Sequence, residues 1–396
     1  MEGPLTGVKV LEVANWLAAP SGCALLADFG ADVVKVEPPD GDALRGYLYN
    51  SAGIQPAVNF PFELCNRGKR GITLDLRRPA ARNVIYDLVK QADVFVTNLL
   101  PQRRERCGVT YEELIQHRPD LIFVSVTGYG STGPDRNRPG YDYAAFWARS
   151  GIMGLLGEPD NPPPPQRPAM GDHSTAMLVA GSVAMALLHR GRTGRGQVVD
   201  LSLQNTGLWV LAADVQAALM GADPVRVPRT AVPNPLWNHY QTQDGRWIML
   251  VMLVSDTYWP NLCRAIDLPD LEQDPRFNSF LNRYQNREAL IALLDGVFAR
   301  RPLAEWHGPL DANGIIWAPA QTIREAVEDP QTVARQPFAT VTHPSAGDIQ
   351  LVDTPVKFSD GGVGVRGPAP ELGQHTEEVL LEIGYTWEDI GKARED

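Results

Sequence analysis

The chain has 396 residues, with 36 Lys and Arg against 47 Asp and Glu, which gives a formal net charge of −11. This length exceeds one small domain and predicts two or three. Hydrophobic residues make up 44% and charged residues 21%, which is ordinary for a globular protein and excludes disorder over the whole chain. The acidic balance argues against a general nucleic-acid binder, and an anionic ligand would need a local basic patch.

The four cysteines are widely spaced and form no C-x-x-C pair, so the sequence encodes neither a zinc knuckle nor a redox dithiol. Scattered thiols fit a reducing compartment. The N-terminus has no basic region followed by a long apolar run, so no signal peptide is expected. The longest apolar stretch, residues 176–188, is shorter than the roughly 18 residues of a membrane span. We therefore expect a cytoplasmic protein that makes no membrane contact.

Short β-rich runs alternate with helical stretches in the first part of the chain. Strands are predicted at residues 8–13, 32–37, 72–76, 93–97 and 121–127. Helices are predicted at residues 20–29 and 79–91. Elements of this length that alternate in this way predict an α/β fold, with a parallel sheet covered by helices on both faces.

The remaining chain is less regular. A proline-rich loop at 159–168 precedes a predicted helix at 173–190, a strand at 198–202 and a further helix to about residue 220. Four prolines between residues 223 and 235 indicate a linker, and Asp244-Gly245 predicts a hairpin over 237–254. We therefore expect a large domain over residues 1–224 and a smaller α+β domain over residues 225–325.

Several common site motifs are missing or misleading. Residues 128–133 match G-x-G-x-x-G, but Pro134 and Pro139 prevent the helix that a dinucleotide site requires. A glycine-permitted turn near a ligand is the better interpretation. The sequence has no P-loop, no G-x-S-x-G elbow and no H-E-x-x-H segment. We expect no metal site and no tightly bound cofactor.

Two basic clusters follow predicted strands, and a solvated surface would explain either of them. They consist of Arg67, Lys69 and Arg70, and of Arg103, Arg104 and Arg106. However, ligands bind at the carboxyl ends of strands in open α/β sheets, and arginine suits phosphate. A phosphorylated small molecule is therefore a plausible ligand.

Asp172 stands in a Met-Gly-Asp turn before the long predicted helix. One interpretation is a helix N-cap, the usual role of Asp at such a place. The other is a nucleophilic carboxylate that the helix dipole keeps ionised. The local sequence leaves both open.

Several segments, in order, resemble family III CoA-transferases, the group of formyl-CoA transferase and carnitine CoA-transferase. They include LEVANWLAAPSGCALLADFGADVVKVEPPDGD, CNRGKRGITLDL, VTNLLPQRRERCGVTYEEL, SVTGYGSTGP, the MGD turn and LGQHTEEVL. The resemblance implies a Rossmann-like large domain built from both ends of the chain, so residues 326–396 should return to it. It also implies a homodimer whose chains interlock like rings.

The resemblance also implies site residues. The family's catalytic aspartate falls on Asp172. Its CoA contacts fall on Asn15, Trp16, Leu17, Arg67, Lys69, Asn98, Arg106 and Tyr129. Three departures count against oxalate as a substrate: Pro38 replaces a nucleotide-binding arginine, residues 232–237 replace a glycine-rich lid, and Leu17 replaces a glutamine.

The expected reaction moves CoA from an acyl-CoA to a carboxylic acid through an aspartyl anhydride and an aspartyl-CoA thioester. With an ordinary pKa near 3.9, Asp172 should be ionised at pH 7 without special tuning. The alternatives are an α-methylacyl-CoA racemase and a non-catalytic CoA-binding subunit. Tyr141 argues against the racemase, because it stands where such an enzyme needs a histidine. Four tryptophans could border the site: Trp16, Trp147, Trp209 and Trp237. One interpretation is that they pack in the hydrophobic core, and the other is that some of them line an acyl pocket for aromatic or branched acids.

Overall fold

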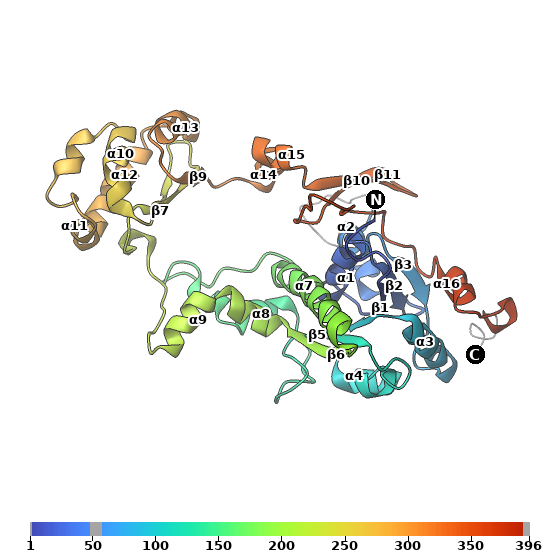
Figure 1. Cartoon of the computed structure of the whole chain (residues 1–396). Coiled ribbons are helices and arrows are strands. Elements are labelled where there is room, and N and C mark those ends of the chain that lie inside the picture. Colours follow the sequence, from blue (N-terminus) through green and yellow to red (C-terminus); the bar gives the residue numbers. More distant parts are fainter. Residues whose placement is uncertain (1, 48–57, 391–396) are drawn as a thin grey trace. The chain divides into compact units, whose positions relative to one another are not determined.

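The computed structural model describes residues 2–47 and 58–390, which fold into two compact units (Figure 1). The larger unit consists of Met1–Gly154, Pro165–Asp223 and Gln336–Asp396, and the smaller of Leu155–Pro164 and Pro224–Arg335. Residues 391–396, the end of the expected C-terminal segment, lie outside the described part.

Six parallel strands form the sheet of the larger unit, in the order β3-β2-β1-β4-β5-β6. They are β1 (Lys9–Val13), β2 (Asp32–Glu37), β3 (Arg70–Thr73), β4 (Val94–Thr97), β5 (Ile122–Thr127) and β6 (Gln197–Ser202). The predicted α/β fold class is therefore confirmed. Because the strand order reverses between β1 and β4, a crevice is expected at their carboxyl ends.

The sheet separates two hydrophobic cores. Adjacent residues of a strand point to opposite faces, so Val10 packs in one core and Leu11 in the other. The helices of the larger unit are α1 (Ala18–Asp28), α2 (Phe60–Asn66), α3 (Pro79–Gln91), α4 (Pro101–Cys107), α5 (Tyr111–Leu114), α7 (Met170–Thr193), α8 (Leu203–Val210), α9 (Ala212–Leu219) and α16 (Thr376–Glu382). Helices α3 and α16 cover the Leu11 side of the sheet.

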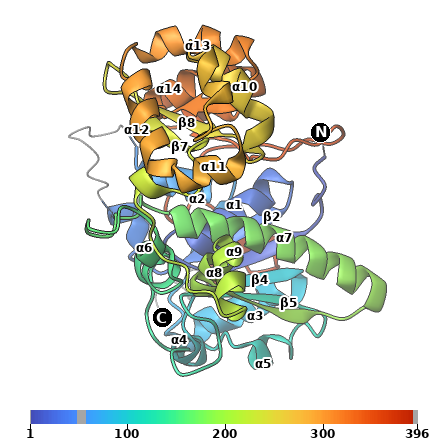
Figure 2. The ribbon, with the colours of Figure 1, turned by 90° about the vertical axis from the view of Figure 1, so that its left-hand side faces the viewer.

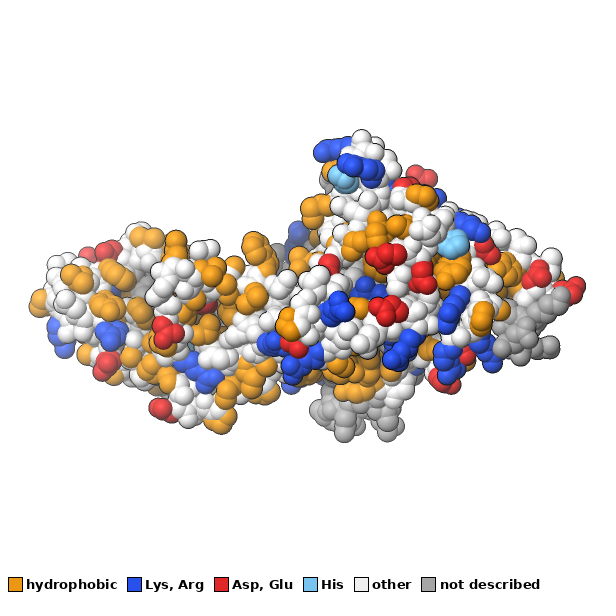
Figure 3. Space-filling model, turned by 90° about the horizontal axis from the view of Figure 1, so that it is seen from below, with side chains coloured by type: hydrophobic (Ala, Val, Ile, Leu, Met, Phe, Trp, Pro, Cys, Tyr) orange, Lys and Arg blue, Asp and Glu red, His pale blue; other side chains and the backbone are white. Residues whose placement is uncertain are grey.

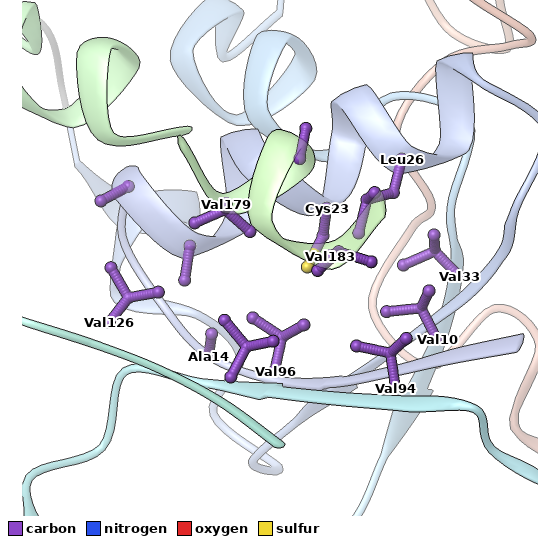
Figure 4. Packing of buried hydrophobic residues seen from close by; sticks show 14 of the residues in the cluster. Val10, Ala14, Cys23, Leu26, Val33, Val94, Val96, Val126, Val179 and Val183 are labelled. Atoms are coloured by element: carbon purple, nitrogen blue, oxygen red, sulfur yellow. The ribbon is translucent and has the colours of Figure 1, made fainter. Parts of the chain in front are cut away.

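Helices α1 and α7 lie side by side over the opposite face of the sheet (Figures 1 and 2). Figure 4 shows Cys23 of α1 with Val179 and Val183 of α7 above the valines of the strands. A Cβ at Gly22 would lie 2.6 Å from Cβ of Val179, so glycine permits this close contact. The position of α7, and of everything at its N-terminus, is therefore fixed by the core.

Some predicted boundaries are wrong. Helix α7 begins at Met170, three residues before the predicted start, and ends where Gly194 adopts a left-handed conformation. The helix predicted to run to about residue 220 is divided at Leu211 into α8 and α9. A π-helix, η2 (Tyr143–Ala148), and a 3-10 helix, η1 (Ala43–Gly46), were not predicted.

The C-terminal residues contribute the hairpin β10 (Phe338–His343) and β11 (Gly347–Val352), and then α16. The N–H of Gly71 donates to Nδ1 of His375 at 3.0 Å, and the N–H of Thr73 donates to Oγ1 of Thr376 at 3.1 Å. These side chains satisfy donors along the free edge of β3, where an unpaired strand would invite pairing with another chain.

The smaller unit has its own hydrophobic core and an antiparallel sheet of β7 (Trp237–Gln241), β8 (Trp247–Val251) and β9 (Trp317–Pro319). Its helices are α10 (Ser255–Ala265), α11 (Phe280–Gln285), α12 (Arg287–Phe298), α13 (Leu303–Ala312), α14 (Ile323–Glu328) and α15 (Pro330–Arg335). Helix α6 (Ile152–Leu155) and two 3-10 helices, η3 (Arg229–Ala231) and η4 (Pro269–Gln273), complete the described elements. None of the helices in residues 2–47 and 58–390 has the length and apolarity to cross a bilayer.

Candidate active site

A cavity of about 890 Å³ lies at the carboxyl ends of the central strands of the larger unit. It occupies the place where the strand order reverses, which is where ligands bind in open α/β sheets. Its lining comes from the segments after β1, β4 and β5 and from the start of α7. The lining residues include Asn15, Trp16, Leu17, Leu44, Tyr47, Asn98, Arg103, Gly128, Tyr141, Asp142, Tyr143, Ala169 and Asp172.

Asp172 lines this cavity from the first turn of α7 and is 9% exposed. The residue before the helix is Ala169, with φ 63°, and Asp172 is the third helical residue. It makes no capping hydrogen bond, so its interpretation as the N-cap is wrong. Only glycine fits at the preceding position, Gly171, because a Cβ there would lie 2.5 Å from Cγ of Phe146.

The surroundings of Asp172 disfavour its negative charge. Burial, and after it the nearby carboxyl of Asp142, raise the pKa of Asp172 to about 8. No cation offsets these effects among the groups that shift it. The expectation that Asp172 is ionised at pH 7 without special tuning is therefore wrong for the free protein.

Hydrogen bonds hold the loop after β1 open towards the cavity. Trp16 adopts a left-handed backbone conformation (φ 63°), and its N–H donates to Oδ1 of Asp42 at 3.1 Å. The N–H of Asn15 donates to Oδ1 of Asn98 at 3.1 Å, and Nδ2 of Asn98 donates to the Asn15 carbonyl at 2.6 Å. Two predicted CoA contacts, Asn15 and Asn98, are therefore joined across the switch point.

A buried charge network lies beneath this loop. Nζ of Lys35 contacts Oε1 of Glu12 at 3.1 Å and Oδ2 of Asp42 at 2.9 Å, and all three side chains are fully buried. Nζ of Lys69 contacts Oε2 of Glu12 at 2.6 Å. Burial alone would raise the pKa of Glu12, but the two ammonium groups outweigh it and lower that pKa.

The predicted CoA contacts divide into two groups. Asn15, Trp16, Leu17 and Asn98 line the cavity, whereas Arg67, Lys69, Arg106 and Tyr129 do not. Arg67 is 4% exposed and pairs with Asp28 at 2.7 Å, and Lys69 is 4% exposed in the charge network. Tyr129 lies beneath the guanidinium groups of Arg138 and Arg149. The first basic cluster is thus largely a set of internal ion pairs.

Arg103 is the one basic side chain among the described residues of the lining. It lies on α4 after β4, and neither it nor Arg106 forms a side-chain hydrogen bond or ion pair within the described part of the chain. Arg104, between them, is 7% exposed and donates to the Leu99 carbonyl at 2.7 Å. The sequence indicated this cluster but could not show which of the three arginines faces the cavity.

Aromatic rings form part of the cavity wall. The ring of Trp16 meets those of Tyr47 and Tyr141 edge to face, at 5.8 and 5.6 Å between centroids. The other three tryptophans that were considered do not line this cavity. Trp147 is buried in the core, Trp209 is 74% exposed on α8, and Trp237 lies on β7 of the smaller unit.

Residues 2–47 and 58–390 contain no group of three or more His, Cys, Asp or Glu side chains that could hold a metal ion. Asp142 is a site residue that the sequence did not single out. The Gly-Tyr-Asp segment that contains it was noticed only for its tyrosine. Next to Asp172, His173 has its pKa lowered by burial and by Arg67, and it does not line the cavity.

Residues 5–376 match the family model described as CoA-transferase family III. The chain is 33% identical to the cinnamoyl-CoA:phenyllactate CoA-transferase of Clostridium sporogenes, over 99% of this chain and 96% of that one. It is 31% identical to the (R)-2-hydroxy-4-methylpentanoate CoA-transferase of Clostridioides difficile, over 99% and 98%. A solved structure of a CaiB/BaiF family protein from Brucella suis superimposes with a TM-score of 0.83, at 32% identity, covering 97% of this chain and 100% of that one.

The raised pKa of Asp172 predicts a pH-dependent effect on stability. Because the native pKa of about 8 exceeds the ordinary 3.8, the folded chain binds this proton more tightly than the unfolded chain. The resulting stabilisation is complete below about pH 4 and is lost as the pH rises through about 8. The Asp172→Asn side chain stays neutral at all pH values. The melting temperature of this variant minus that of wild type should therefore increase as the pH is raised from 5 to 9.

Scanning calorimetry across this range measures the difference, with Asp87→Asn as a matched control. Lys90 and the Tyr385 hydroxyl outweigh burial and lower the pKa of Asp87, so that variant should lose stability relative to wild type as the pH rises. A constant difference for Asp172→Asn at all pH values would contradict the assignment.

Proposed function

The chain belongs to CoA-transferase family III, and on this premise we propose that it transfers CoA from an acyl-CoA thioester to a carboxylic acid, with Asp172 as nucleophile. The observation that carries the proposal is the place of Asp172. Its carboxyl lines a cavity at the sheet's switch point, among the segments that the family uses for CoA.

The ionised carboxylate of Asp172 attacks the thioester carbonyl, and the C–S bond breaks with its electron pair on the CoA sulfur. The mixed anhydride is then attacked by the thiolate at the aspartyl carbonyl, which gives an aspartyl-CoA thioester and the free first acid. The acceptor acid repeats these steps in reverse. The thiolate must stay beside the anhydride, and such positioning can lower a barrier by roughly 7–11 kcal/mol.

The CoA tail binds along the loop after β1 and towards α4. Asn15, Trp16, Leu17 and Asn98 supply contacts from the lining. Arg103 and Arg106 are three residues apart on α4, so their side chains share a face of the helix. Both are exposed and have no carboxylate partner among the described residues, and such guanidinium groups suit the phosphates of CoA.

The acyl group and the acceptor acid are aromatic or branched monocarboxylates. Trp16, Tyr47 and Tyr141 present an aromatic wall, and Leu17 and Leu44 add apolar surface. A second carboxylate on the substrate would need a cation, and Arg103 is assigned to CoA. The two relatives above agree with this class, since their names specify phenyl-bearing and branched acids.

The enzyme acts as an interlocked homodimer. This proposal rests on the family resemblance and on apolar side chains at the surface of the larger unit. Hydrophobic side chains are also visible at the surface in Figure 3. On α7, α8 and the end of α9, six such residues are at least 56% exposed: Met185, Leu188, Trp209, Val210, Leu219 and Met220. Burying such surface between two copies favours association.

Asp172→Ala is expected to reduce CoA transfer to below a few per cent of wild type while leaving CoA binding nearly unchanged. The substitution removes the nucleophile but no capping bond. Transfer is followed by mass spectrometry and CoA binding by calorimetry. The control is Ser174→Ala, which removes only a hydroxyl bonded to the Met170 carbonyl at 2.8 Å. An Asp172→Ala protein with substantial transfer would refute the assignment.

Arg103→Ala and Arg106→Ala should each weaken CoA binding by about ten- to hundredfold, since a charge-assisted hydrogen bond contributes roughly 1.5–3 kcal/mol. Lys90→Ala is the control, because this exposed cation lies in the last turn of α3, at the amino end of the sheet. Unchanged CoA affinity in both arginine variants would exclude α4 from the CoA site.

A panel of acyl-CoA donors and acids, read by mass spectrometry, tests the substrate class. Aryl and branched monocarboxylates should form new CoA esters, and oxalate and succinate should form few. Trp16→Ala should reduce kcat/KM at least tenfold for an aryl acid and less for acetate. Preferred transfer to a dicarboxylate would contradict the aromatic wall as the acyl site.

Sedimentation velocity tests the dimer. The wild type should sediment as a dimer at all accessible concentrations, and Trp209→Glu should weaken or misfold it. The matched control is Trp387→Glu, which changes a tryptophan that is 66% exposed outside these helices. A folded, concentration-independent monomer would end the proposal.

A further inference from the structure

Asp142 is a buried carboxylate beside the proposed nucleophile that has no part in the mechanism above. It is 3% exposed and lines the same cavity as Asp172. Nε2 of Gln166 donates a hydrogen bond to its carboxylate. The backbone N–H groups of Tyr143, Gly171 and Asp172 also oppose the rise in its pKa that burial causes. The protein thus favours the negative charge of Asp142 despite its burial.

The carboxylate of Asp142 acts on the start of α7. Helix α7 has no capping side chain of its own, because Ala169 precedes it. The first N–H groups of a helix have no carbonyl partner within it, and those of Gly171 and Asp172 interact favourably with the charge of Asp142. Phe146 of η2 touches Gly171 in the same turn, which leaves no room for a Cβ. Asp142 therefore fixes the backbone that carries Asp172.

The two carboxyl groups are unequal partners. Burial raises the pKa of both, and the nearby charge of Asp142 raises that of Asp172 further. Gln166 donates a hydrogen bond to Asp142, whereas none of the described residues donates to the carboxyl of Asp172. Two carboxyl groups that line one cavity can share one proton, and the donor places the negative charge on Asp142. In the resting pair the proton therefore lies on Asp172.

Gln166 can serve Asp142 in either protonation state. Its Nε2 donates to the carboxylate, and its buried Oε1 has no hydrogen-bond partner in residues 2–47 and 58–390. Rotation of the amide by half a turn would present Oε1 to the O–H of a protonated Asp142. The same side chain thus has a donor for the charged group and an acceptor for the neutral one.

We propose that Asp142 is a positioning residue that takes the shared proton from Asp172 when Asp172 attacks the thioester. This rests on the proposed role of Asp172 as nucleophile. The proton moves to an oxygen of Asp142, an electron pair of Asp172 forms the bond to the carbonyl carbon, and the C–S pair leaves with sulfur. When the last step releases Asp172, the proton returns. One proton stays on the pair through the cycle, so no external acid or base is consumed.

The other titratable groups around the pair do not compete for this proton. Burial raises the pKa of Cys65 on α2 to about 11 and also raises that of Tyr143 on η2. Burial and Arg67 lower the pKa of His173, which favours its neutral form. Tyr47 and Arg167 complete the set near Tyr143.

Asp142→Asn tests the proposal, because asparagine is neutral like the protonated acid and keeps a carbonyl acceptor for α7. Removing the like charge should move the acid limb of the pH–kcat profile to lower pH by at least one unit. Asp142→Ala should instead lose activity at every pH, since the cap is gone. The control is Asp87→Asn on α3, over the opposite face of the sheet, which should leave the profile unchanged.

Infrared titration gives a readout without substrate. The wild type should show one buried carboxylic-acid carbonyl band near neutral pH, which is lost in Asp172→Asn and titrates at lower pH in Asp142→Asn. An Asp142→Asn pH–kcat profile that is lower but unmoved, or an infrared band whose titration is unmoved in that variant, would show a purely structural role and overturn the proposal. Transfer by Asp172→Ala would refute the nucleophile itself, and this outcome is separate from either result for Asp142.

Discussion

Two lysines buried beneath the carboxyl ends of β1 and β2 fix the loop on which the site is built. Removing Lys35 and Lys69 from water is unfavourable, and only closely placed carboxylates offset it. Glu12 contacts both ammonium groups, and Asp42 contacts Lys35 with one oxygen. With its other oxygen, Asp42 accepts the N–H of Trp16. The charge network therefore determines the backbone of the cavity loop.

This network also explains why the cavity is not basic. The lysines are neutralised by two carboxylates inside the fold, and Arg67 is neutralised by Asp28. None of these cations is among the groups that shift the pKa of Asp172, which burial and Asp142 raise. The described lining of the cavity thus has an acidic, aromatic side and one arginine, Arg103. Such a division suits a ligand with an apolar acyl end and a phosphorylated end.

The same environment creates a requirement for proton control. A carboxyl group in a low-dielectric cavity favours its neutral form, whereas attack on a thioester needs the anion. A nearby group that accepts the proton without leaving the cavity meets both conditions. The left-handed Ala169, the tight Gly171 and the π-helix η2 all lie where Asp142 meets Asp172. Irregular backbone of this kind is concentrated at functional sites.

The sequence by itself determined the α/β class, because strand and helix periodicities are local properties of the chain. Resemblance over several ordered segments, rather than any one motif, identified the family. The strand at residues 317–319 escaped prediction because three residues carry too little periodicity. The division of the long helix at Leu211 likewise has no proline or glycine to announce it.

Only the tertiary structure decided what the charged residues do. The sequence placed both basic clusters after strands, but Arg67 follows α2 and precedes β3. Arg67 pairs internally with Asp28, 39 residues away, whereas Arg103 follows β4 and lines the cavity. Asp172 and Asp142 are 30 residues apart in sequence, and no local pattern predicts that they share a buried space. The ionisation of a side chain depends on the dielectric and charges around it. Those surroundings come from distant parts of the chain, and they exist only once the chain has folded.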